Sequence, residues 1–162
     1  MKRLLPLLAL ALAGCGLHPL YQGGGSGAVA AALSGVEVAP IQGRGGWLVA
    51  SALRERFAAT GSPRYRLDVK LDDQIAGLGV RRDDSVARER RTLRARYQLV
   101  ETATGTVLLD ATAGSDAGID VVGSEYATIA AENTAQERLA DIVADQIVAR
   151  VALYTRRAGA NP

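Results

Sequence analysis

The amino-acid sequence predicts an α+β fold, a two-layer sandwich in which a mostly antiparallel sheet of about four strands packs against two helices. Two kinds of residue pattern predict it. Apolar and charged residues alternate in several short segments, as in strands with one buried face. In two other segments apolar residues recur every three or four positions, as in amphipathic helices. The second of these helices is long and C-terminal.

The strands are predicted from alternation and from turn signals. Residues 36–41 alternate around a proline, which is typical of an edge strand or of a strand end. The segment from Tyr65 to Asp72 alternates apolar with charged side chains, and the segment from Leu93 to Leu99 repeats this pattern. Residues 102–105 form a hairpin turn signal. A partner strand therefore begins at Val107 and extends toward Val122.

The two helices are predicted from helical spacing. The first carries an apolar stripe from Val49 to Phe57 and ends at Gly61–Pro63. The second begins after Ser124, whose hydroxyl suits an N-cap, and runs to about Arg156, which is roughly 45 Å of helix. Its apolar positions recur at three- and four-residue steps and include Ile129, Leu139, Val143, Ile147, Val151 and Tyr154.

The N-terminus is predicted to be a lipoprotein signal peptide. Lys2 and Arg3 precede an apolar run that ends at Ala13 and is too short to span a bilayer. The run leads into Leu-Ala-Gly-Cys15, which resembles the lipobox of bacterial lipoproteins, and Cys15 is the only cysteine. In that family the cysteine carries a diacylglycerol and, after cleavage, an N-acyl chain. We therefore expect a mature chain anchored to a membrane through Cys15; the alternative is an unmodified cysteine in an ordinary secreted protein.

The expected organisation is a signal peptide over 1–14, a lipid-anchored flexible tether over 15–30, one α+β domain over 31–157 and a disordered tail over 158–162. The tether contains the run QGGGSG. Removal of residues 1–14 leaves 148 residues with 17 basic and 17 acidic side chains. The mature chain is thus neutral, so any preference for a partner must come from local charge.

The residues needed for catalysis or metal binding are missing from the sequence. The only histidine, His18, lies three residues from the expected anchor. The acidic pairs 72–73 and 83–84 are sequential, so on a strand their side chains point to opposite faces. No serine lies in a G-x-S-x-G motif, and acylation would leave no free thiol. We predict a protein that is not an enzyme and has no metal or cofactor other than the acyl chains on Cys15.

Residues 81–96 are rich in arginine, with seven arginines against three acidic residues. The planar guanidinium group binds oxyanions through two donors, which suits phosphate. Nucleic acid is not expected as a target of an exported lipoprotein, whereas a phosphorylated or acidic lipid is. The alternative is a solvated strand face next to a hairpin loop, which Arg94 and Arg96 fit well.

Three segments together resemble the lipopolysaccharide-assembly lipoprotein family, LptE, of Gram-negative outer membranes. Cys15–Tyr21 (CGLHPLY) matches the family start C-G-[FY]-x-P-L-Y, with Leu17 in place of the aromatic residue. Tyr97–Gly105 (YQLVETATG) resembles the strand and turn before the hairpin partner, and Ser124–Thr128 with the alanines that follow resembles the entry to the C-terminal helix. The likeness covers essentially the whole mature chain in order and spacing.

The resemblance implies an α/β sandwich that sits inside the LptD β-barrel of the outer membrane, on the periplasmic side. There it would assist folding of that barrel and delivery of lipopolysaccharide to the outer leaflet. Basic residues near the loop between the second and third strands, here about 77–91, are implied to bind lipopolysaccharide. The other function left open is that of a lipid-binding auxiliary lipoprotein of a phospholipid transport system. The candidate lipopolysaccharide-binding residues are Arg81, Arg82, Arg88, Arg90 and Arg91.

Substitution of Arg90 and Arg91 by alanine is expected to weaken lipopolysaccharide binding and to leave barrel binding and the melting temperature unchanged. This expectation treats both arginines as loop residues.

Overall fold

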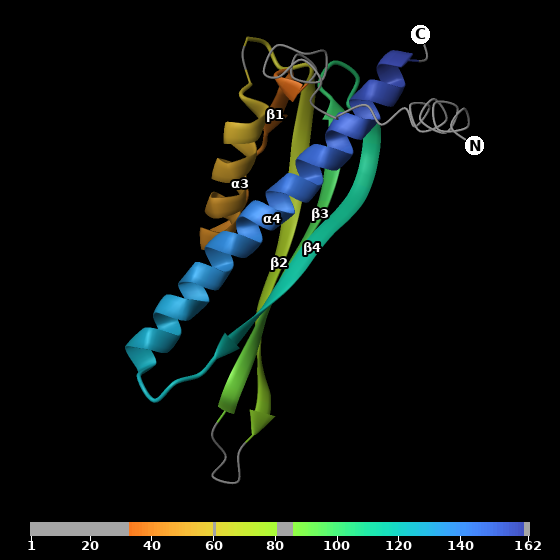
Figure 1. The fold of residues 1–162 in the computed structure, drawn as a ribbon. Coiled ribbons are helices and arrows are strands. Elements are labelled where there is room, and N and C mark those ends of the chain that lie inside the picture. The colour runs from red at the N-terminus through yellow and green to blue at the C-terminus, as the bar shows by residue number, and fades with distance from the viewer. Residues whose placement is uncertain (1–32, 60, 81–85, 161–162) are drawn as a thin grey trace, which may run out of the picture.

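A computed structural model describes residues 33–59, 61–80 and 86–160. It contains four strands and two helices in the order strand, helix, three strands, helix, as Figure 1 shows. Within the described residues, no helix combines the length and the apolar character needed to cross a bilayer. The elements are β1 (Val36–Val38), α3 (Gly43–Phe57), β2 (Tyr65–Val80), β3 (Val86–Glu101), β4 (Val107–Asp120) and α4 (Glu125–Ala160).

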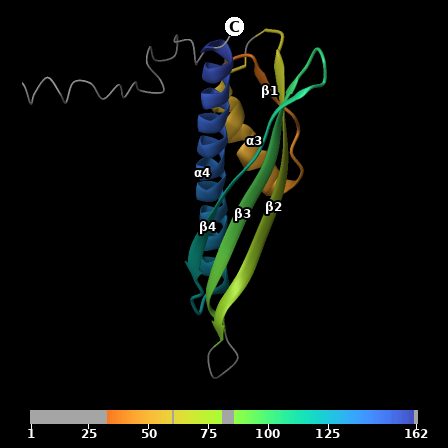
Figure 2. The same cartoon turned by 90° about the vertical axis from the view of Figure 1, so that its right-hand side faces the viewer.

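The strands form one sheet in the order β1-β2-β3-β4. The short strand β1 runs parallel to β2, whereas β2–β3 and β3–β4 are antiparallel hairpin pairs. Both helices lie on the same face of this sheet (Figures 1 and 2). The prediction of a mostly antiparallel, four-stranded two-layer sandwich with a long C-terminal helix is confirmed.

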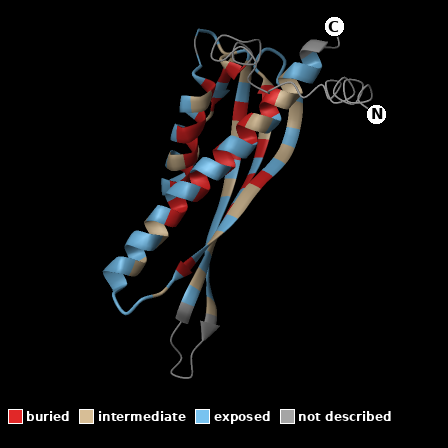
Figure 3. Cartoon of the chain, in the orientation of Figure 1, coloured by how far each residue is buried: buried red, intermediate tan, exposed pale blue. Residues whose placement is uncertain are grey.

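The core lies between the helices and the half of the sheet that includes β1, which is the upper half in Figures 1 and 3. The stripe predicted for α3 is buried, and α3 ends at Ala58, which has a left-handed backbone with φ 46° and donates its N–H to the carbonyl of Arg54. In α4 the side chains that recur every fourth position are fully buried. The buried positions of α4 include Leu139, Val143, Ile147 and Val151.

The helix α4 is longer than predicted and is only partly packed. Ser124 does cap it, because its hydroxyl accepts the N–H of Ala127 at 3.4 Å. The helix continues to Ala160, so three residues expected in a disordered tail are helical. No side chain before Ala135 is buried, and Ile129 is 48% exposed instead of lying in the core. Figure 3 shows this start of α4 as a mostly exposed segment that extends beyond the core.

The β2–β3 hairpin is also longer than predicted. Each strand has 16 residues, and their pairing runs from Tyr65 opposite Glu101 to Val80 opposite Val86. The expected loop over 77–91 is therefore wrong, because residues 77–80 and 86–91 are strand. The alternation of buried and exposed residues on β2 ends near Leu71, but backbone pairing between strands does not require burial. The predicted turn over 102–105 is confirmed, with Gly105 at φ 72°.

Candidate functional site

The face of the sheet that the helices leave uncovered carries a row of arginines on β3. Side chains alternate between the two faces of a strand, so the even-numbered residues of β3 point away from the core. Four of these residues are exposed arginines, spaced along about 26 Å of strand. We call this set the arginine row: Arg88, Arg90, Arg94 and Arg96.

Three members of the arginine row are paired with aspartates of β4. Arg88 lies 2.9 Å from Asp120 and Arg90 lies 4.0 Å from Asp116. The third is Arg96, which donates to both carboxylate oxygens of Asp110. These side chains are between 36% and 74% exposed. Such exposed pairs contribute only about 0–1 kcal/mol, so an anionic ligand can replace the aspartate at little cost.

The Arg96–Asp110 pair has the most hydrogen bonds of the three. Hydrogen bonds from Arg96 and Gln98, together with the Arg96 charge, lower the pKa of Asp110. The hydrogen bonds and charge of Asp110 in turn raise the pKa of Arg96. Both groups therefore stay charged throughout the physiological pH range.

Two cations on this face form no ion pair with a described residue: Arg94 in the arginine row and Lys70 on β2. The Arg94 side chain crosses β4 at Gly114, where a Cβ atom would lie 2.6 Å from Arg94 Cδ. A glycine at this position therefore leaves the space that the side chain occupies. The sequence contains this signal, since a glycine inside a strand often marks a close approach.

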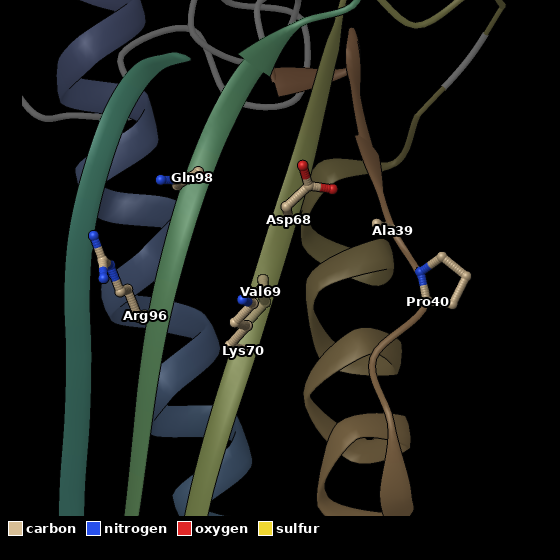
Figure 4. Close-up of a pocket in the computed structure, with 7 residues that line it drawn as sticks. All are labelled: Ala39, Pro40, Asp68, Val69, Lys70, Arg96 and Gln98. Carbon is tan, nitrogen blue, oxygen red and sulfur yellow. The ribbon is translucent and has the colours of Figure 1, made fainter. Parts of the chain in front are cut away.

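A pocket of about 270 Å³ opens beside the upper end of the arginine row. Figure 4 shows Arg96 and Gln98 of β3 and Asp68 and Lys70 of β2 beside the segment that follows β1, at Ala39 and Pro40. Both carboxylate oxygens of Asp68 accept hydrogen bonds from Arg66 at 2.9 Å. The ammonium group of Lys70 is therefore the unpaired charge at this pocket.

Arg91 lies on the opposite face of β3 from the arginine row and has a different environment. Its guanidinium donates two hydrogen bonds to Asp73 of β2, at 2.8 and 2.7 Å, and one to the carbonyl of Glu132 in α4. The amide of Gln136, also in α4, donates to Asp73 at 2.8 Å. The side chains of Arg91 and Asp73 are only 12% and 21% exposed. This Arg91 cluster (Arg91, Asp73 and Gln136) joins the hairpin to α4.

The Arg91 cluster holds its carboxylate in the charged form. Partial burial of Asp73 opposes ionisation, but the hydrogen bonds from Arg91 and Gln136 and the Arg91 charge outweigh it and lower the Asp73 pKa below its ordinary value of 3.8. Close packing leaves little room at the cluster, since a Cβ on Gly45 of α3 would lie 3.1 Å from the Asp73 carboxylate. Arg91 therefore links β3 to β2 and to the first part of α4.

The candidate residues predicted from the sequence therefore do not form a single cluster. Arg88 and Arg90 are exposed on the outer face, whereas Arg91 is in the layer between sheet and helices. Arg81 and Arg82 lie outside the described residues, as does Cys15. Sequence reasoning placed Arg94 and Arg96 on a solvated strand face, and the structure adds them to the same row as Arg88 and Arg90.

The arrangement suits binding of an anionic ligand. Among residues 33–59, 61–80 and 86–160, no group of three histidine, cysteine or acidic side chains could hold a metal ion. What this face offers is a line of exposed guanidinium groups above a stiff sheet, and such groups recognise phosphate and carboxylate oxygens.

Comparison with solved structures gives the same fold. A proposed lipoprotein from Caulobacter crescentus CB15 is 26% identical, with a TM-score of 0.66 over 84% of this chain and 99% of that one. A minor lipoprotein from Acinetobacter baumannii is 12% identical, with a TM-score of 0.57 over 74% and 91% of the two chains. Lipoprotein B from Nitrosomonas europaea is 13% identical, with a TM-score of 0.59 over 76% and 88%. The last two comparisons concern the fold alone.

No curated protein matches the chain. The family model of LptE, described as Lipopolysaccharide-assembly, matches residues 33–151, which span every strand and most of α4. The chain belongs to the LptE family of lipopolysaccharide-assembly lipoproteins.

Proposed function

We propose that this protein is an outer-membrane lipoprotein that binds and plugs the LptD β-barrel, assists its assembly and helps to deliver lipopolysaccharide to the outer leaflet. The observation that carries the proposal is the family match over residues 33–151. The described geometry agrees with a binding role, since it offers an exposed row of guanidinium groups and a helix whose start is unpacked. The proposed location is the periplasmic side of the outer membrane.

The proposed anchor is Cys15, acylated after removal of residues 1–14. Two or more acyl chains give stable membrane attachment where one chain does not, because each buried methylene contributes about 0.8 kcal/mol. We expect mass spectrometry of the mature protein to show an N-terminal cysteine that carries a diacylglycerol and an N-acyl chain. A free thiol at Cys15, or a Cys15→Ser form that is still cleaved and still bound to membranes, would contradict this assignment.

The arginine row is the proposed contact for lipopolysaccharide. Phosphates and acidic sugars present several anions close together, and the arginines of the row follow one another along β3 at steps of about 7, 13 and 7 Å, so neighbouring members can bind such anions together. Arg94 has no described acidic partner, and the Arg90–Asp116 pair is loose at 4.0 Å. Of the four arginines in the row, these two therefore give up the weakest ion pairing when they bind a phosphate.

The test combines an Arg90→Ala/Arg94→Ala variant with Arg64→Ala, an exposed arginine outside the row, as the matched control. We expect the double variant to bind purified lipopolysaccharide about tenfold more weakly, corresponding to about 1.4 kcal/mol, and with less dependence on salt. The wild type and both variants should co-purify with a large outer-membrane barrel from detergent-solubilised membranes. If the double variant binds lipopolysaccharide as tightly as the wild type, the arginine row is not the contact for lipopolysaccharide. If no barrel co-purifies with the wild type, the proposed function is contradicted.

A further inference from the structure

Beyond the end of β1, β2 forms an edge of the sheet with no described strand beside it. The N–H of Tyr65 donates to Gly35, and the carbonyl of Leu67 accepts from Ala39. Odd-numbered residues of β2 therefore direct their backbone groups away from β3, toward the edge. β1 ends at Val38, so from Leu71 onward these groups have no hydrogen-bond partner among the described residues. Figure 2 shows this part of β2 at the margin of the sheet, with no described segment beyond it.

The other edge of the sheet, formed by β4, is capped at one residue by a side chain of α4. The backbone N–H of Gly114 in β4 donates to the side-chain oxygen of Gln146 in α4 at 3.0 Å. The Gln146 amide donates in return to the Gly114 carbonyl at 3.3 Å. An unpaired, exposed edge is a template for pairing with another extended chain. A side chain of α4 therefore blocks strand addition at Gly114 of β4, whereas no described side chain bonds the outward backbone groups of β2 from Leu71 to Gly77.

One carboxylate oxygen with no hydrogen-bond partner among the described residues lies one strand in from this open edge. Glu89 of β3 is opposite Gly77 of β2 in the register and points to the helix side of the sheet. Its Oε2 atom is buried and accepts no hydrogen bond, although the residue as a whole is partly exposed. Gly77 has no side chain, so the β2 residue opposite Glu89 places no side chain between the carboxylate and a strand added at the edge. That strand would lie about 10 Å from β3, a distance that a lysine or arginine side chain can cover.

A second copy of this chain cannot supply the missing cation by antiparallel pairing of the two β2 edges. A residue placed opposite Gly77 must come from the set of β2 residues that face the helix side. Those residues are apolar, aromatic, glycine or Asp73, with no lysine or arginine among them. Self-pairing in any register would therefore leave Glu89 without a basic partner or would add a second negative charge.

We propose that the open edge of β2, from Leu71 to Gly77, pairs with an extended segment of a different protein. That segment carries a basic residue opposite Gly77, which binds the Glu89 carboxylate, and an apolar residue opposite Ile75. Ile75 is 43% exposed and faces the same side of the sheet as Glu89. The inference rests on the proposed function only in requiring a protein partner, and it does not depend on lipopolysaccharide binding.

Amide hydrogen exchange gives the direct test, because added-strand pairing has an alternating signature. We compare the isolated chain with the chain in its complex extracted from solubilised membranes. The N–H groups of Leu71, Asp73, Ile75 and Gly77 should exchange at least tenfold more slowly in the complex. The even-numbered neighbours, bonded to β3, should be protected in both samples and serve as the internal control.

Two variants test the side-chain part of the proposal. Ile75→Pro removes one outward N–H and keeps the hydrogen bonds to β3, and Glu89→Arg places a like charge against the basic residue of the partner. Each should reduce recovery of the partner about tenfold, whereas Gln74→Lys, on the outer face of the same strand, should not. Circular dichroism of each variant shows whether it folds. If Ile75→Pro does not fold, Glu89→Arg still tests the proposal.

The possible outcomes separate this inference from the proposed function. A barrel that co-purifies while the odd-numbered amides still exchange freely overturns the inference alone. Protection of those amides by a partner that is not a barrel supports the inference and contradicts the proposed function. Protection in the isolated chain at high concentration, together with a dimer mass, would identify a second copy as the occupant and overturn the inference.

Discussion

Substitution of Arg91 by alanine should destabilise the protein by roughly 2–3 kcal/mol, because it removes charged hydrogen bonds from a largely buried aspartate. The side chain joins β2, β3 and α4 through Asp73 and the Glu132 carbonyl. Its loss leaves the Asp73 carboxylate with Gln136 as its only side-chain partner. We expect the thermal midpoint to fall by roughly 5–10 °C. Thermal and urea unfolding of the mature chain measure this effect.

This expected loss corrects the prediction that an Arg90→Ala/Arg91→Ala change would spare the melting temperature. The two arginines are adjacent in the sequence but point to opposite faces of β3, and only Arg91 is enclosed. Arg90→Ala alone is the matched control and should change stability by less than about 0.5 kcal/mol. Equal effects of the two single substitutions would contradict the role assigned to the Arg91 cluster.

The Arg91 cluster also predicts the direction of the pH dependence. The Asp73 pKa is lowered in the folded protein, so ionised Asp73 stabilises the fold. That contribution is complete above the ordinary carboxyl pKa of about 3.8 and is lost as the pH falls through the lower, folded value. Asp73→Asn should therefore be less stable than wild type at pH 7, and the difference should shrink under acid conditions. A difference that grows on acidification would contradict this assignment.

Substitution of Tyr97 by alanine should have the largest effect, a destabilisation of about 3–5 kcal/mol, as for other buried aromatic residues. Tyr97 is the largest fully buried side chain among the described residues and lies in the second half of β3, with Val69 and Ala111 as its register neighbours. Burial also raises the pKa of its phenol, against the effect of the Arg150 charge. Chemical denaturation of the variant should show the loss as a lower midpoint with an unchanged slope.

Tyr97→Phe is the control for the hydroxyl group. No described residue forms a hydrogen bond with that hydroxyl, so its removal should cost less than about 1 kcal/mol. If Tyr97→Phe were as destabilising as Tyr97→Ala, the contribution of Tyr97 would come from a polar contact and not from packing of the ring.

Local sequence patterns were sufficient to predict the element types and the fold class. Period-two alternation in 65–72 and 93–99 and the four-residue spacing in α4 reflect the burial of one face, which is a local property of a strand or helix. The turn at Gly105 and the Ser124 cap likewise depend on residues within a few positions of each other. Alternation failed beyond Leu71, because the helix-side positions of β2 there include Asp73 and Gly77 and so do not form a continuous apolar face.

The roles of individual charged residues depended on the tertiary structure. The sequence shows seven arginines over 81–96, but which of them are exposed depends on the pairing register and on where α4 crosses the sheet. Arg91 finds Asp73 eighteen positions away and Glu132 forty-one positions away, contacts that no local pattern encodes. Local patterns likewise do not show that the edge of β2 is open, or that Oε2 of Glu89 has no described hydrogen-bond partner. Whether a strand edge or a carboxylate has a partner is a property of the assembled sheet, since distant segments supply the partners.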